Sequence, residues 1–110
     1  TAAVKISSIL FAYRSAVLRP RIRTALTEAA QTARGAQVVT ITGYTQTDLT
    51  SPISRRANLD LARRRAEKVR AYLRAHGVTA RVVIIAKGAV NPISTQRQNL
   101  NRRVEISARY

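Results

Sequence analysis

The sequence predicts an α/β fold, a two-layer sandwich in which helices pack on a mixed sheet in the order βαβαββ. The first observation is a set of short segments that are rich in β-branched residues or alternate apolar with polar residues, a pattern typical of strands. The second is a pair of longer segments with apolar residues at helical spacing. The third is the length: 110 residues can bury one modest core without disulfides, so we expect 1–110 to form a single domain.

The first half of the chain predicts a strand, a helix and a second strand. Val4–Phe11 alternates apolar with polar side chains and predicts the first strand. Pro20 is favoured in the first turn of a helix, which we expect to run to Ala33. Gly35 lies just past that end, where helices commonly end with a residue in the left-handed backbone conformation. Gln37–Thr42 is short and β-branched, and it predicts the second strand.

The second half predicts a loop, the second helix and two further strands that are separated by another loop. A polar loop at Tyr44–Ser54 precedes the second helix. Arg81–Ala86 is apolar on both faces, which predicts a central position in the sheet. After a loop over Gly88–Asn101, the alternating segment Arg103–Ala108 predicts a last strand with one covered face.

The second helix, which we expect to begin at Ser54 or Ala57 and to end at Arg74, carries the main functional clue. At about 100° per residue, Asn58 and Arg65 fall in the middle of its apolar face. A guanidinium directed toward a core costs free energy unless it has a partner. The apolar face itself is made of Leu61, Ala62, Ala66, Val69, Tyr72 and Leu73.

Two interpretations of these polar residues remain open from the pattern alone. Arg65 either extends past Leu61 and Tyr72 to reach water, or is fixed at a strand–loop–helix junction where it can fork onto a carboxylate. Asn58 lies seven residues earlier on the same face, about 10 Å along the axis. Its side chain either caps the first turn or belongs to the same site as Arg65.

The charge is strongly positive, with 20 Lys and Arg against five Asp and Glu and a formal net charge of +15. Such a field favours polyanionic partners, namely nucleic acid, anionic lipid headgroups or acidic wall polymers. The alternative is that the Arg residues only form a solvated surface. The five aromatic residues are too scattered for an obvious stacking platform, and no helix-turn-helix, zinc-finger or RNA-recognition signature is present. These details argue against a nucleic-acid-binding module.

The sequence offers little for catalysis or metal binding, so we expect no enzyme, no metal and no cofactor. Cys is absent, and His76 sits at a helix end away from the acids, so no catalytic triad can be assembled. The four Gly are isolated and form no phosphate loop. No apolar run is long enough to span a bilayer. The abrupt start at Thr1 suggests a fragment of a longer protein.

The spacing Asn58-x-x-Leu61-x-x-x-Arg65-Ala66-x-x-Val69-x-x-x-Leu73 resembles the core pattern N-x-x-L-S-x-x-R-A-x-x-V-x-x-x-L of the OmpA C-terminal-like family, with Ala62 in place of the Ser. Three further segments resemble family elements in the right order. They are Phe11-Ala-Tyr-Arg-Ser-Ala-Val-Leu-Arg-Pro20, Val39-Thr-Ile-Thr-Gly-Tyr-Thr45 and Asn101-Arg-Arg-Val-Glu-Ile106. The resemblance covers nearly the whole chain.

This resemblance implies noncovalent binding of peptidoglycan stem peptides through diaminopimelate. In the family, the motif Arg holds the ligand carboxylate and an Asp holds its ammonium, while a Thr and the motif Asn add hydrogen bonds. Carried onto this chain, the matching residues are Arg65, Thr45 and Asn58. A small zwitterion above the helix would then be the missing partner of the misplaced Arg65.

The chain departs from the family at the acidic positions. The ammonium-binding Asp is replaced by Gln46, and the acids often found in the first-strand motif are Ala12 and Arg14. Gln46 can accept a hydrogen bond from an ammonium but cannot neutralise it, which would weaken binding by about 1–3 kcal/mol. Asp48 is two residues away and could take the ammonium role. The rival hypothesis is a site for a carboxylate-only or anionic ligand.

The resemblance therefore implies an extracytoplasmic domain of the cell envelope that binds peptidoglycan and anchors its parent protein to the wall. We expect the chain to be part of a longer exported or membrane-anchored protein, with membrane contact only through segments outside this chain. The alternative is a degenerate domain of the same fold whose basic surface binds another anionic polymer or a protein partner. Nucleic-acid binding is a third and weaker hypothesis.

Overall fold

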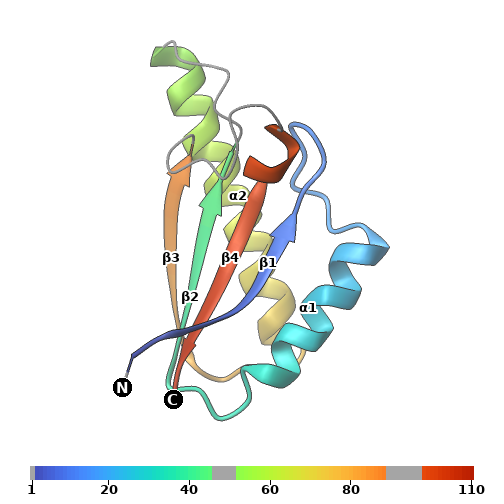
Figure 1. The fold of residues 1–110 in the computed structure, drawn as a ribbon, viewed down its shortest axis with the longest axis vertical. Helices are drawn as coiled ribbons and strands as arrows, with labels where there is room; N and C mark the ends of the chain where they lie inside the picture. The colour runs from blue at the N-terminus through green and yellow to red at the C-terminus, as the bar shows by residue number, and fades with distance from the viewer. Residues whose placement is uncertain (1, 46–51, 89–97) are drawn as a thin grey trace.

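The computed structural model describes residues 2–45, 52–88 and 98–110. The elements follow one another as predicted, βαβαββ, with a short 3-10 turn before the last strand. The strands form one four-stranded sheet, and Figure 1 shows them side by side with both helices on one face. The bounds are β1 Val4–Leu10, α1 Pro20–Thr32, β2 Val38–Tyr44, α2 Pro52–Ala75, β3 Arg81–Gly88, the 3-10 turn Gln98–Asn101 and β4 Arg103–Arg109.

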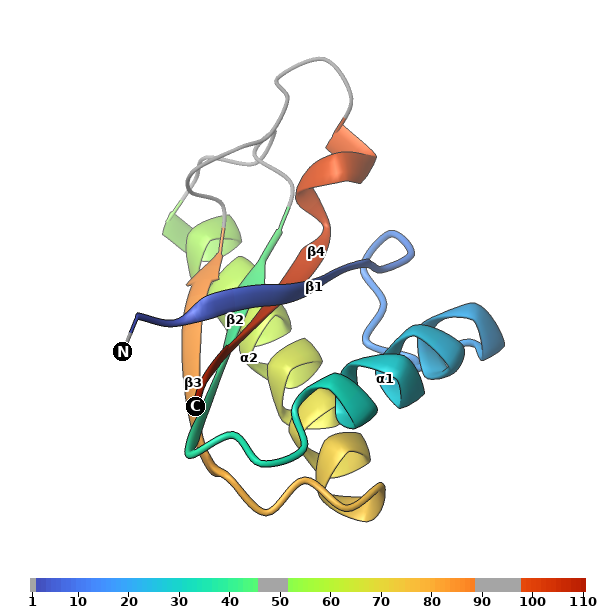
Figure 2. The same cartoon turned by 60° about the horizontal axis from the view of Figure 1, so that its bottom comes forward.

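The sheet is mixed, with strand order β1-β4-β2-β3. Strand β2 pairs parallel with β3, whereas β4 pairs antiparallel with both β1 and β2. The turned view in Figure 2 shows α1 and α2 together under the same side of the sheet. The core fills the space between these layers, and three alternate residues of β4, Val104, Ile106 and Ala108, are fully buried in it. The predicted two-layer sandwich with a mixed sheet is confirmed.

The predicted central position of the third strand is wrong. Strand β3 forms one edge of the sheet, and the two central strands are β2 and β4. An apolar run implies a central strand only where both faces are covered. Here the helices cover one face, so Val82 and Ile84 pack on the core while Ile85 remains 38% exposed.

Helix α1 begins at Pro20, as predicted, and ends at Thr32, with Ala33 as its C-cap. Its buried face contains Ile22, Leu26, Ala29 and Ala30. The Thr27 hydroxyl lies 2.8 Å from the Tyr72 hydroxyl and links α1 to α2. Gly35 has φ 80, the left-handed conformation expected just past the helix.

Helix α2 begins at Pro52, earlier than the predicted start at Ser54 or Ala57, and runs 24 residues. Its apolar face is buried except for Tyr72, which is half-buried, and Asn58 and Arg65 are buried with it. Close packing against β2 depends on Gly43, because a Cβ added there would overlap the Ala62 carbonyl oxygen and lie 2.9 Å from its carbonyl carbon. Within the described ranges, α2 is too polar and α1 too short to be a membrane-spanning helix, and no other helix qualifies.

Candidate functional site

The Arg65 side chain is fully buried where β1, β2 and α2 meet. Its three guanidinium nitrogens each donate to a backbone carbonyl oxygen: Nε to Ser15 at 2.8 Å, Nη1 to Tyr44 at 3.0 Å and Nη2 to Ala12 at 3.1 Å. Two of the acceptors lie in the connection after β1 and the third ends β2. Arg65 therefore joins three parts of the chain that are distant in sequence.

The interpretation in which Arg65 reaches water past Leu61 and Tyr72 is wrong. The side chain is 0% exposed, because the three carbonyls satisfy the fork inside the protein. The guanidinium is instead fixed at the strand–loop–helix junction. A guanidinium has five N–H groups, so one N–H on Nη1 and one on Nη2 remain beyond these three bonds. These two N–H groups are the donors that Arg65 has left for a ligand carboxylate.

The surroundings of Arg65 are electropositive. Burial, followed by the nearby charges of Arg102 and Arg64, lowers the pKa of Arg65 to about 10. The group is still a cation at neutral pH. The Phe11 ring lies 5.3 Å from its Cζ, and none of the ion pairs among the described residues involves Arg65. A bound carboxylate would therefore form an ion pair with a cation that no described acid neutralises.

Among the residues that the structure describes, Thr45 and Asn58 each carry a buried polar atom without a hydrogen-bond partner. The Oγ1 of Thr45 and the Nδ2 of Asn58 are both in this state, and the residues are 2% and 6% exposed. Buried polar atoms are normally bonded, and leaving one unpaired costs about 1–3 kcal/mol. Thr45 directly follows Tyr44, whose carbonyl Arg65 binds, and its own N–H donates to Gly88. Two unused hydrogen-bonding atoms thus belong to the segments joined by Arg65.

Three of the five residues predicted for the site, Arg65, Asn58 and Thr45, lie in these joined segments. Gln46 and Asp48 lie outside the described residues. The backbone acceptors of Arg65 were not predicted from sequence, because every residue carries a carbonyl and its identity gives no signal. Arg102 was also missed; its place in the Asn101-Arg-Arg-Val-Glu-Ile106 segment could have indicated it.

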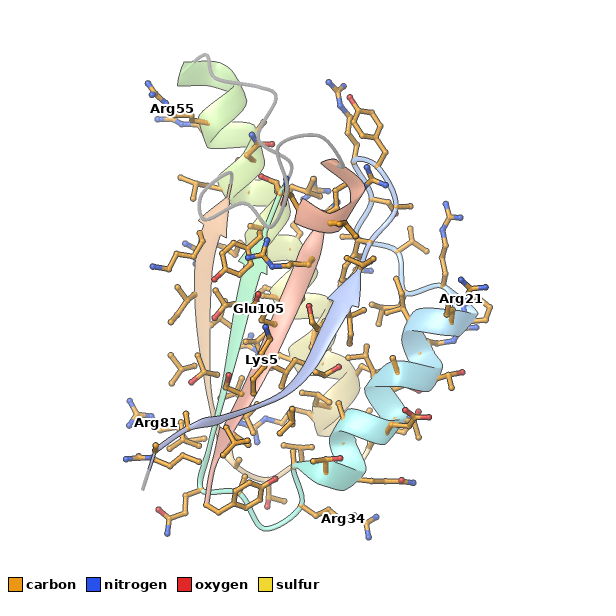
Figure 3. All side chains as sticks on the ribbon, in the orientation of Figure 1. Lys5, Arg21, Arg34, Arg55, Arg81 and Glu105 are labelled. Atoms are coloured by element: carbon orange, nitrogen blue, oxygen red, sulfur yellow. The ribbon has the colours of Figure 1, made fainter. Side chains whose placement is uncertain are left out.

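A second charged network lies on the sheet face away from the helices. The guanidinium of Arg103 stacks on the Tyr44 ring, with its Cζ 3.7 Å from the centroid, and its Nε donates to Glu105 at 2.7 Å. Lys5 lies 3.5 Å from the same carboxylate, and Figure 3 shows Lys5 and Glu105 close together on this face. Partial burial would raise the pKa of Glu105, but the hydrogen bond and charge of Arg103, together with Lys5, hold it below its ordinary value.

This network makes a pH dependence testable. A carboxyl with a lowered folded pKa stabilises the fold above its unfolded pKa, and the contribution is lost as the pH falls through the folded value. We expect Glu105→Gln to lower the free energy of unfolding by about 1 kcal/mol at pH 7 and by a smaller amount at pH 3. Urea unfolding at both pH values measures this. Glu67→Gln, which removes an exposed pair with Arg70, is the control with a small effect. A Glu105→Gln deficit that stayed constant with pH would contradict the assignment.

Fold and site together define an OmpA-like domain: a two-layer βαβαββ sandwich with a buried helix arginine holding the strand ends. The OmpA family model matches residues 10–105, and the chain belongs to the OmpA family.

The relatives include outer membrane protein A of Bordetella avium, 36% identical over a match that covers 87% of this chain and 51% of that protein. This chain thus spans about half the length of that curated relative. The structure is also similar to the peptidoglycan-associated lipoprotein from Burkholderia pseudomallei, with TM-score 0.78, 25% identity and coverage of 93% and 89% of the two chains. A third match is the cell wall anchor of the T6SS from Pseudomonas aeruginosa, with TM-score 0.72, 26% identity and coverage of 92% and 78%.

Proposed function

We propose that this domain binds peptidoglycan noncovalently through its stem peptide, without catalysing a reaction, and so anchors its parent protein to the wall in the cell envelope. Arg65 binds a carboxylate of diaminopimelate, and Asn58 and Thr45 add hydrogen bonds. The observation that carries the proposal is the pair of unpartnered buried atoms, Thr45 Oγ1 and Asn58 Nδ2, in the segments joined by an unneutralised cation. Membership of a family whose domains bind peptidoglycan supports it.

The described residues of this site offer hydrogen-bonding groups for the carboxylate half of a zwitterion but no acid for its ammonium half. Arg65 retains two N–H groups, Thr45 offers a hydroxyl and Asn58 an amide N–H. Because Arg65 is fully buried, the ligand must open a path to its guanidinium as it binds. For the ammonium we propose Asp48, since Gln46 cannot neutralise it. The proposal is tested by Asp48→Asn, which should weaken binding while leaving folding unchanged.

The sharpest test replaces Thr45 by Val. An unpaired buried hydroxyl is unfavourable, so Thr45→Val should raise the free energy of unfolding by about 1 kcal/mol. If the hydroxyl serves the ligand, the same change should weaken binding by about 5–10-fold, the value of one hydrogen bond. Urea unfolding and sedimentation with purified, nucleic-acid-free sacculi measure the two effects. Thr40→Val, in the strand β2 that ends just before Thr45, is the control for hydroxyl removal and should leave sedimentation unchanged.

The outcomes separate the proposed site from the basic surface. If wild type fails to sediment with sacculi, the proposed function is wrong. If Thr45→Val and Asp48→Asn sediment like wild type and binding disappears at high salt, the basic surface holds an anionic polymer instead, because exposed charges are screened there. Sequence-dependent DNA binding that persists at about 0.3 M salt would favour the nucleic-acid hypothesis.

A further inference from the structure

The connection after β1 forms a tight turn that Arg65 holds at both ends. The Ser15 N–H donates to the Ala12 carbonyl at 3.1 Å, which closes the turn over Tyr13 and Arg14. Both end residues also accept from the Arg65 guanidinium, through their carbonyl oxygens. The two central residues are exposed, so the turn presents their side chains outward at a fixed place beside the buried arginine.

Arg14 occupies this turn in a conformation that is unfavourable for its residue type. Its φ is 52°, and it is the one non-Gly residue with positive φ among the described residues. The left-handed region costs a residue with a Cβ roughly 1–2 kcal/mol, and such strain is concentrated at functional sites. A glycine would satisfy the backbone here without the guanidinium.

Two guanidiniums gather at the Tyr13 ring, which is 53% exposed. The Cζ of Arg14 lies 5.2 Å from the ring centroid and that of Arg102 lies 6.0 Å from it. Arg102 is held in place because its Nε donates to the Phe11 carbonyl at 3.0 Å, and its charge is close enough to act on Arg65. The described ion pairs do not include Arg14. Three cations therefore converge on one turn beside the proposed ligand site.

We propose that Tyr13, Arg14 and Arg102 form a second carboxylate-binding point, so that the site selects stem peptides with a free carboxylate beyond the one held by Arg65. The inference rests on the proposed function and names its preferred ligand. A carboxylate accepts charge-assisted hydrogen bonds from a guanidinium, whereas a carboxamide is uncharged and also presents N–H donors that a guanidinium cannot accept. Amidation of the recognised carboxylate should therefore weaken binding, and the loss should depend on Arg14.

The test compares three synthetic tripeptides, L-Ala-γ-D-Glu-meso-diaminopimelate and its forms amidated at either the D-Glu α-carboxylate or a diaminopimelate carboxylate. Calorimetric titration gives their affinities for wild type and Arg14→Gly. Wild type should bind one of the amidated peptides about 10-fold more weakly than the free peptide. Arg14→Gly should bind the free peptide about 10-fold more weakly than wild type does. In Arg14→Gly, the same amidation should change the affinity little. Arg14→Gly should unfold at no lower temperature than wild type, since glycine accepts the positive φ.

Arg34→Asn, near the far end of α1 in Figure 3, is the control for loss of one surface charge and should behave like wild type.

The failures of the two proposals are distinguishable. If no amidation gives a loss of affinity that depends on Arg14, the second carboxylate point is wrong, while sedimentation of wild type with sacculi still supports the proposed function. If wild type binds none of the peptides and does not sediment with sacculi, the proposed function is wrong and the selectivity inferred from it falls too.

Discussion

Replacing Arg65 with Met is expected to lower the free energy of unfolding by about 2–4 kcal/mol. The change removes three charge-assisted hydrogen bonds, each worth about 1.5–3 kcal/mol, while relieving the cost of burying a cation offsets part of that loss. The Ala12 carbonyl keeps the Ser15 N–H as a donor, but Ser15 and Tyr44 lose the bonds that Arg65 gives their carbonyls. Urea unfolding followed by circular dichroism measures the effect.

Arg65→Lys decides whether charge or geometry matters. Lysine keeps the buried charge, but its compact ammonium cannot reproduce a planar fork aimed at three carbonyls on separate segments. We therefore expect Arg65→Lys to be at least as destabilising as Arg65→Met. A lysine variant as stable as wild type would contradict the role assigned to the fork. In both variants sacculus binding should fall under conditions where they remain folded, as the proposed function requires.

Replacing Gly43 with Ala is expected to lower the free energy of unfolding by about 3 kcal/mol. The new Cβ would overlap the backbone of Ala62, which no rotamer change can move aside. Strand β2 cannot retreat either, because it is paired on both sides, with β3 and with β4. Helix α2 must therefore shift, and with it Asn58 and Arg65 would move away from the end of β2.

Gly35→Ala is the matched control for this second substitution. Gly35 has a positive φ of 80 but no atom within 4 Å of an added Cβ, so only the backbone conformation opposes the change. We expect a loss of about 1 kcal/mol there. Equal losses at both glycines, measured by urea unfolding, would mean that the contact between β2 and α2 adapts and that the close approach is unimportant.

The sequence by itself determined the order of the elements and the buried face of α2. Both depend on local periodicity: the alternation in Arg103–Ala108 and the helical spacing around Leu61 are visible without any partner. The same periodicity placed Asn58 and Arg65 on the buried face, and the structure confirms that position. The family motif pointed to the same two residues as part of a site.

Only the tertiary structure decided what surrounds Arg65 and how the strands are ordered. Its acceptors are carbonyls 21 to 53 residues away in the chain, and a backbone carbonyl has no sequence signature. Strand order was misjudged at Arg81–Ala86 because an apolar run does not reveal whether one or both faces of a sheet are covered. Long-range partners are set by packing of the whole chain, whereas periodicity records only which side of an element is buried.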